Sequence, residues 1–404
     1  MNWRLRPTTS LCIVAATLLL GACNSQPIRS TPARQASVNP PQPIPEHLLL
    51  DAGIDILDPG IEYLEEGVST TTPSVRKAEA VHASHSIAKT MQRTGNWGAV
   101  KIIPSGQSET DIYVTGKIIK SDGESLSLKV RVTDSAGDTW YNRTYSDTLS
   151  QYAYDRAVRQ QQEPFQHIYD QIARDMEDYA RRTEPTKREA LRAISKMRFA
   201  QRFAPEDYND FLRDEGNGKY TLLRLPAETD PVINHIESIR IRDQMFVDRL
   251  QDYYATFNNR MLVPYDQWRE ASYHETKALR KLKSDATARK IGGALAVVAG
   301  ILAQASENAS ARNAGVLGIG GGAYLFKSGV DRGSEAKIHE EAMKEMADSL
   351  GAEVEPYSID LADKTVTLSG TVDEQYAQWR AILNNIYLAE TGKLPPQDYS
   401  DYEL

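Results

Sequence analysis

The stretch that decides the fold lies at residues 111–140 and reads DIYVTGKIIKSDGESLSLKVRVTDSAGDTW. Apolar and polar residues alternate over Ile112–Ile119 and again over Leu126–Val132, which is the pattern of half-buried strands. Two turn-forming runs, Ser121–Gly123 and Asp134–Asp138, follow these segments. The pattern therefore predicts an antiparallel meander of strands.

Upstream of the meander, Gly53–Leu57 and Val100–Ile103 read as two further strands. A helix between them is predicted to start at Pro73 and to stop at Gly95, because proline favours the first helical turn and glycine ends helices. Downstream, Phe165–Tyr179 places apolar residues on one helical face that could cover the sheet. The order predicts an α/β or α+β sandwich with a largely antiparallel sheet.

Three runs in this region carry a family resemblance: Gly98–Pro104 (GAVKIIP), Asp111–Gly116 (DIYVTG) and Ser121–Glu124 (SDGE). A strand, a Val-x-Gly segment and a polar hairpin in this order resemble the α/β domain shared by three envelope proteins. These are the curli-secretion lipoprotein CsgG, the N-terminal domain of TolB and the penicillin-binding-protein activator LpoB. The resemblance implies a non-enzymatic envelope role, either binding a partner or forming a pore.

The middle of the chain, from Glu184 to about Ala286, reads as helical. Two apolar stripes at helical spacing support this, one formed by Ala190, Ile194, Met197 and Phe203 and one by Ile236, Ile239, Ile241, Met245, Phe246 and Leu250. We expect these side chains to form core. The alternative is a helical platform for a partner, although no fixed-period repeat accompanies it.

Two glycine-rich apolar segments, Ile291–Gln304 and Ala314–Phe326, follow with a small polar linker between them. Small residues let helices approach closely, so the pair predicts a helical hairpin that is buried in a soluble domain, inserted in a membrane or packed in an oligomer. The candidate contact residues are Gly293, Gly300, Gly318 and Gly322. Each segment is about 20 Å long as a helix, short of the ~30 Å hydrocarbon layer. The basic stretch Lys277–Lys290 before them could rest on anionic headgroups.

The C-terminal part predicts a small α+β domain. Its expected elements are a helix at Ala336–Leu350, strands at Val354–Leu361 and Thr365–Val372, and a helix at Gln375–Leu388. The segment Val366–Val372 resembles BON domains, a resemblance that implies contact with envelope surfaces. The residues after Gly392 are expected to be loose.

The first residues are typical of a targeting segment. Arg4 and Arg6 precede a short apolar run, which ends in Leu20-Gly21-Ala22-Cys23. This ending resembles the lipobox of bacterial lipoproteins, which implies cleavage between Ala22 and Cys23 and lipidation of Cys23. The alternative is an ordinary secretory signal. Asn24, where that family uses Asp to signal inner-membrane retention, favours the outer membrane with the body facing the periplasm.

The composition is that of a globular, acidic protein. The formal charge of −8 becomes about −10 once Arg4 and Arg6 are removed, which argues against a nucleic-acid partner. Cys12 and Cys23 are the only cysteines, so no disulfide is expected after processing. The expected organisation is a signal peptide at 1–22, a proline-rich tether at 23–46, the sandwich at 48–180, a helical domain at 184–290, the glycine-rich hairpin at 291–327, the α+β domain at 335–391 and the tail at 392–404.

Three motifs resemble active-site motifs, but in each case the surrounding residues do not complete the site. Gly318–Ala323 matches G-x-G-x-x-A, but a glycine-rich run precedes it where a dinucleotide site needs a strand. His339–Met343 has Met where a zincin needs its second His. Glu79, His82 and His85 could share a helical face and bind zinc, although no second-shell partner is identifiable. We therefore expect no enzyme activity, no cofactor and no metal.

The sequence predicts a non-catalytic envelope lipoprotein that acts as scaffold, assembly factor or regulator of an outer-membrane or periplasmic machine. Its expected contacts are the membrane, through Cys23, and an envelope protein; a homo-oligomer is left open. The alternative is a component of an oligomeric secretion or export channel in the outer membrane. An uncharacterised hydrolase would require carboxylates that converge in a cleft.

Overall fold

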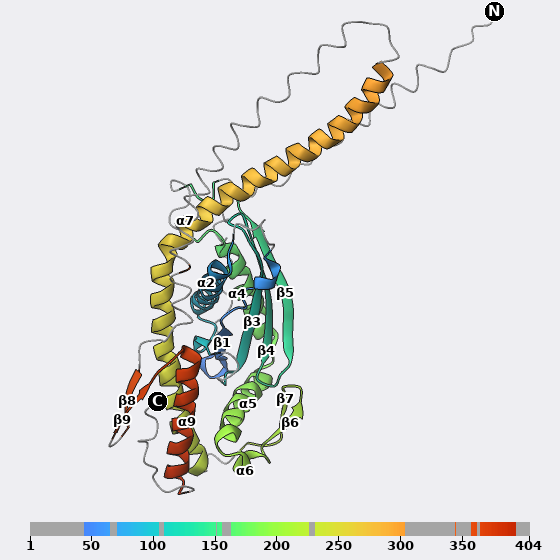
Figure 1. Ribbon diagram of the computed structural model, residues 1–404. Coiled ribbons are helices and arrows are strands. Elements are labelled where there is room, and N and C mark those ends of the chain that lie inside the picture. The colour runs from blue at the N-terminus through green and yellow to red at the C-terminus, as the bar shows by residue number, and fades with distance from the viewer. Residues whose placement is uncertain are drawn as a thin grey trace, which may run out of the picture.

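The structure is a computed structural model with a mixed α+β fold (Figure 1). It describes residues 44–64, 71–104, 109–150, 152–155, 163–225, 231–303, 344, 357–361 and 364–392. The signal peptide, most of the tether, the second glycine-rich segment, the expected helix at 336–350 apart from Lys344, and nearly all of the tail lie outside these ranges.

The main sheet has five strands in the order β2-β1-β3-β4-β5. The strands are β1 (Ala52–Asp55), β2 (Val100–Ile103), β3 (Ile112–Ser121), β4 (Ser125–Asp134) and β5 (Thr139–Thr148). β1 pairs in parallel with both β2 and β3, whereas β3, β4 and β5 form the expected antiparallel meander. The sheet is therefore mixed: the longer, antiparallel ladders agree with the prediction, and the two parallel pairings of β1 were not predicted. A helical crossover links β1 to β2, and such a connection returns the chain in the same direction.

Helices α2 (Pro73–Gln92) and α4 (Gln166–Arg182) cover one face of this sheet (Figure 1). Both confirm the helices expected from the sequence. The inward-facing residues of β4 are its alternate apolar ones, Leu126, Leu128, Val130 and Val132, all buried at 1 % exposure or less. The other face of the sheet stays open at Lys129, Arg131 and Thr144. One face is thus core and one face is surface, as the alternation predicts.

The middle of the chain begins with α5 (Pro185–Phe203) and the short α6 (Pro205–Tyr208). It then forms a hairpin of β6 (Leu212–Gly216) and β7 (Lys219–Leu222), where the sequence analysis expected only helix. The turn of this hairpin meets the β4–β5 turn so closely that a Cβ on Gly137 would lie 2.0 Å from the Gly218 carbonyl oxygen. The expectation fails here because contact with another turn holds the hairpin in place.

Helix α7 (Pro231–Ala303) has 73 residues and is about 110 Å long at 1.5 Å per residue. Figure 1 shows it running along the body and then away from it. Pro264 lies inside the helix, where the missing N–H removes one main-chain hydrogen bond. The first glycine-rich segment, expected as one arm of a hairpin, is the end of this helix.

The C-terminal elements are the strand pair β8 (Tyr357–Leu361) and β9 (Lys364–Leu368) and the helix α9 (Val372–Glu390). They confirm the predicted strand pair and final helix. A capping box between Thr371 and Glu374 starts α9, which then packs along the first half of α7 (Figure 1). One continuous apolar cluster joins the sheet, α2, α4, α5, α7 and α9.

Candidate functional site

The residues that the sequence singled out are distributed unevenly over the structure. Ala22, Cys23, Gly318 and Gly322 lie outside the described residues. Gly293 and Gly300 belong to the last turns of α7. Within the described part of the chain, no group of three or more His, Cys, Asp or Glu side chains gathers to hold a metal ion.

Glu79 and His82, two residues of the weighed zinc set, instead belong to a buried polar seam between α2 and α7. We use "polar seam" for the hydrogen-bonded and ion-paired group listed next. Its members are Arg76, Glu79, His82, Ser121, Glu163, Asn258, Tyr265, Asp266 and Arg269. They come from α2, the end of β3, the segment before α4, and α7.

His82 connects three of these elements through its imidazole ring. Its Nδ1 lies 2.9 Å from Oδ1 of Asn258 on α7, and its Nε2 lies 3.3 Å from Oε2 of Glu163. His85, one turn further along α2, is only partly buried. Burial, together with the neighbouring His82, lowers the pKa of His85 to about 4. It is therefore a neutral ring at physiological pH.

Arg269 and Glu163 form the centre of the polar seam. The guanidinium donates to both carboxylate oxygens of Glu163, at 2.5 and 3.1 Å, and also bonds Asp266. It lies 4.2 Å from the ring centroid of Tyr265, and its side chain is 1 % exposed. Burial alone raises the pKa of Glu163, but the charge of Arg269 and the contact with His82 outweigh it and hold this pKa far below its usual range. The pair is thus a charged, bidentate contact.

Glu79 holds the other end of the polar seam. One carboxylate oxygen accepts from the Tyr265 hydroxyl at 2.6 Å and from Ser121 Oγ at 2.5 Å. The other lies 3.9 Å from Nε of Arg76. Burial, and then the charge of Glu79, raises the pKa of the Tyr265 hydroxyl well above its ordinary value, so that it stays a donor. Helix α7 is therefore bonded to α2 at two levels.

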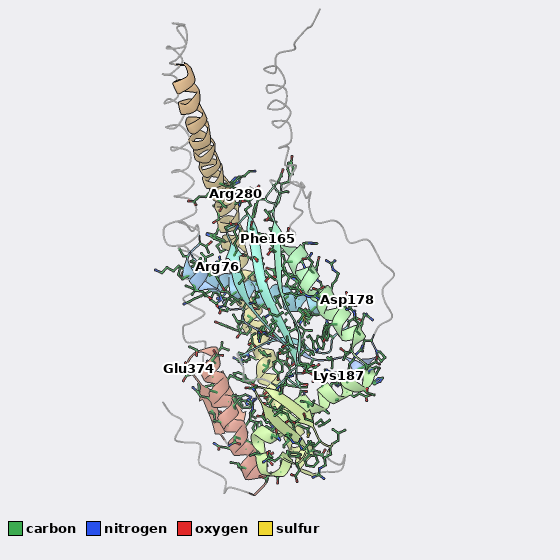
Figure 2. All side chains as sticks on the ribbon, turned by 90° about the vertical axis from the view of Figure 1, so that its right-hand side faces the viewer. Arg76, Phe165, Asp178, Lys187, Arg280 and Glu374 are labelled. Atoms are coloured by element: carbon green, nitrogen blue, oxygen red, sulfur yellow. The ribbon has the colours of Figure 1, made fainter. Side chains whose placement is uncertain are left out.

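The β3–β4 turn closes the polar seam from the side. Gly123 has a φ of +77°, and a Cβ there would lie 2.5 Å from the Arg269 carbonyl oxygen and 2.6 Å from the Tyr273 amide nitrogen. Thr276 Oγ1 donates to the Asp122 carbonyl at 2.9 Å, and Arg280 pairs with Glu124 at 2.6 Å. Figure 2 labels Arg280 where α7 leaves the body. Only a glycine allows this close approach of turn and helix.

Closer to the N-terminus of α7, the side chain of Gln251 forms main-chain hydrogen bonds with edge strand β2, as a neighbouring strand would. Gln251 accepts from the Ile102 N–H at 2.8 Å and donates to the Ile102 carbonyl at 2.8 Å. Lys101 on the same strand pairs with Asp248 at 2.7 Å. Edge strand β2 is thereby covered by the helix, which prevents pairing with another chain at this point.

The N-terminal part of α7 is hydrogen-bonded and ion-paired to α9. Tyr376 donates to Asp243 at 3.1 Å, and Arg380 lies 3.5 Å from the same carboxylate and 5.4 Å from the ring centroids of Phe199 and Phe203 on α5. Burial raises the pKa of Asp243, against the opposing effects of Arg380 and Tyr376. These contacts, the Gln251 pair and the polar seam bond successive parts of α7 to the body.

Sequence reasoning missed the polar seam except for Glu79 and His82. A signal for it exists in α7, because Asn258, Tyr265 and Arg269 fall at helical spacing among the buried residues Met261 and Trp268. A charged residue within an apolar stripe must have a partner. The partner, Glu163, lies 106 residues away in sequence, and no local pattern identifies it.

Comparison with protein-family models, curated proteins and solved structures finds no match for this chain. The resemblance of residues 98–124 to the CsgG, TolB and LpoB domain therefore stays a prediction. Among the described residues, no helix is both long and apolar enough to cross a membrane.

Proposed function

We propose that this chain is a non-catalytic cell-envelope lipoprotein, anchored by Cys23 to the periplasmic side of the outer membrane, that acts as a scaffold for an envelope machine. The observation that carries the proposal is helix α7, which is fixed to the body by three polar contact groups and then extends beyond it (Figure 1). A helix held in this way has a defined direction, as a scaffold requires.

The sequence supplies the location. The lipobox-like run Leu20–Cys23 supports lipid anchoring, and the proline-rich residues that follow it support a tether. The resemblance of the α/β domain to CsgG, TolB and LpoB supports a protein partner. The open face of the main sheet, which presents Lys129 and Arg131, offers a surface for that partner.

The anchor is tested by Cys23→Ala, with Cys12→Ala as the matched control. Both variants are expressed with the natural signal, and the processed N-terminus is analysed by mass spectrometry. We expect a lipid modification in the wild type and in Cys12→Ala, and none in Cys23→Ala. An unlipidated wild type with a free N-terminus would refute the anchor and favour an ordinary secretory signal.

The scaffold role is tested by crosslinking in intact cells followed by purification from detergent-solubilised envelopes. We expect a specific envelope protein whose yield falls when the open sheet face is altered by Lys129→Glu and Arg131→Glu. The charge reversal Arg260→Glu, at an exposed position on α7, serves as control. Recovery of the chain without any partner under these conditions would contradict the proposal.

A second candidate is a subunit of an oligomeric export channel. The observation in its favour is the glycine content of the end of α7, where Gly292, Gly293 and Gly300 would allow close helix packing between copies. The mass of the purified protein in mild detergent distinguishes the scaffold from the channel subunit. A monomer contradicts the channel, and a closed ring contradicts the simple scaffold.

A further inference from the structure

The end of α7 extends beyond every other described element of the body (Figure 1). The last bond that a described side chain of α7 makes to the body is the Arg280–Glu124 ion pair. From there the helix continues to Ala303, a distance of about 35 Å at 1.5 Å per residue. We call the part at 281–303 the distal arm.

The chemistry of the distal arm changes along its length. Its first ~15 Å contains Lys281, Lys283, Arg289 and Lys290, with Asp285 as the one acid. The next ~20 Å, residues 291–303, contains no charged residue and is apolar at nearly every position. A helix that is apolar on all sides is stable only when something other than water surrounds it.

We propose that the distal arm is a second membrane anchor, whose apolar end enters a bilayer while the basic residues before it contact anionic lipid headgroups. A length of ~20 Å reaches into the hydrocarbon layer without crossing its ~30 Å. The basic residues lie between the apolar end and the body, at the level where the headgroups would lie if the apolar end entered the bilayer. Each Lys or Arg near an anionic surface strengthens binding about fivefold.

The reach of the lipid tether permits both contacts with one membrane. His47, bonded to Arg192 on α5, lies at the end of the main sheet that is opposite Glu124 and Arg280. The ten-residue strands β3 and β4 make these ends about 33 Å apart, and Lys290 lies ~15 Å beyond Arg280. The chain between Cys23 and His47 can extend to roughly 70 Å. The tether is therefore longer than the distance from the basic residues of the distal arm to the far end of the sheet, so Cys23 and the distal arm can reach the same bilayer.

The proposal rests on the envelope location proposed above but not on lipidation, so we test it without the lipid. The probe is the processed chain with Cys23→Ala, which contains no cysteine. It is floated with vesicles of phosphatidylethanolamine and phosphatidylglycerol, and separately with vesicles of phosphatidylcholine. We expect flotation with the anionic vesicles, weakened by salt, and about a hundredfold weaker binding to the neutral ones, since the distal arm has a net charge of +3 at 281–290.

Matched variants on the same helix locate the contact. Val297→Asp in the distal arm should reduce binding about tenfold or more, whereas Val263→Asp, at a 65 % exposed position beside the body, should not change it. Lys283→Glu with Lys290→Glu should weaken anionic binding at least about 25-fold, about fivefold for each positive charge lost, against Arg260→Glu as control. Circular dichroism and thermal unfolding establish that each variant is folded.

A fluorophore gives a readout that does not depend on binding strength. Val297→Cys and Val263→Cys, made in the cysteine-free chain, each accept a single environment-sensitive label. Blue-shifted emission at position 297 alone, quenched by quenchers in the acyl layer, is the expected result. Equal flotation of Val297→Asp and the parent, or no shift on vesicles, would overturn the proposal. A shift that appears without vesicles and rises with protein concentration would assign the distal arm to a second copy and equally overturn it.

Discussion

At the scale of single residues, Arg269 is the buried cation at the centre of the polar seam. Its guanidinium is the bidentate partner of Glu163, and its side chain is 1 % exposed. Removal of one partner from a buried ion pair leaves the other charge without compensation, which costs far more than the pair itself contributes.

We therefore expect Arg269→Gln to lower the free energy of unfolding by about 3–5 kcal/mol in urea denaturation. The double variant Glu163→Gln with Arg269→Gln should lose less than the sum of the two single changes, because the uncompensated charge is gone. Arg260→Gln, exposed on the same helix, should stay within ~0.5 kcal/mol of the parent. Additive single effects would show that the two residues do not depend on each other.

Gly123 allows a test of the close approach between the β3–β4 turn and α7. Gly123→Ala combines a positive φ with Cβ distances of 2.5 and 2.6 Å to the α7 backbone. Gly216→Ala has a similar φ of +82°, but nothing lies within 4 Å of its Cβ. Both should lose about 1–2 kcal/mol for the left-handed backbone, and Gly123→Ala about 1–3 kcal/mol more for the clash. Equal thermal shifts would mean that the turn can move away from the helix at little cost.

Asp55, at the end of β1, should make stability depend on pH. Burial and then the nearby Asp373 raise its pKa from 3.8 to about 6. The folded state therefore holds this proton more tightly, and the stabilisation is complete below the unfolded pKa and lost as pH rises through about 6. Asp55→Asn should raise the free energy of unfolding by about 1–2 kcal/mol above pH 6 and change little near pH 4.

Asp58 provides the control of opposite sign for this measurement. A hydrogen bond from Lys117 leads the effects that lower the Asp58 pKa. Its stabilisation is present above the unfolded pKa and disappears in acid, so Asp58→Asn should destabilise at neutral pH. Melting temperatures of both variants across this pH range check the two signs together. A gain for Asp55→Asn that is the same at both ends of the range would contradict the assignment.

At the scale of elements, the side chain of Gln251 joins helix α7 to the edge of the sheet. Gln251→Leu would leave the N–H and carbonyl of Ile102 without their partner, at a cost of about 2 kcal/mol. Amide hydrogen exchange should accelerate at Ile102 and much less at Ile54 in the sheet interior. Gln251→Glu keeps an acceptor for the Ile102 N–H, so it should protect that amide from exchange better than Gln251→Leu does. Unchanged exchange in both variants would mean that the edge is protected by other contacts.

The sequence predicted those elements that carry their own signal. The meander of β3, β4 and β5 and the start of α2 at Pro73 were identified because alternation, turn residues and a proline in the first helical turn are local signals. The final helix was expected from Gln375 but starts at Val372, because the capping box of Thr371 and Glu374 was not recognised. Pairing of β1 with two parallel neighbours and the β6–β7 hairpin were missed, because they depend on a crossover and on contact between two distant turns. The polar seam was missed for the same reason, since its partners are far apart in sequence.

At the scale of the whole molecule, one apolar cluster runs through sheet, helices and C-terminal elements. Burial of this kind, rather than disulfides, stabilises a chain whose two cysteines both precede residue 24. The polar contacts of α7 then select one direction for the helix on that core. The metal and cofactor expectations of the sequence analysis stay predictions.

The length of α7 also has a mechanical consequence. A helix that is bonded to the body and then extends beyond it works as a lever, whose pivot is its last contact with the body, the Arg280–Glu124 ion pair. A tilt of about 10° there would carry Ala303, some 35 Å beyond Arg280, sideways by about 6 Å. Small rearrangements of Arg280 and Glu124 would thus be magnified at the far tip, and a force applied to the tip would act first on that ion pair.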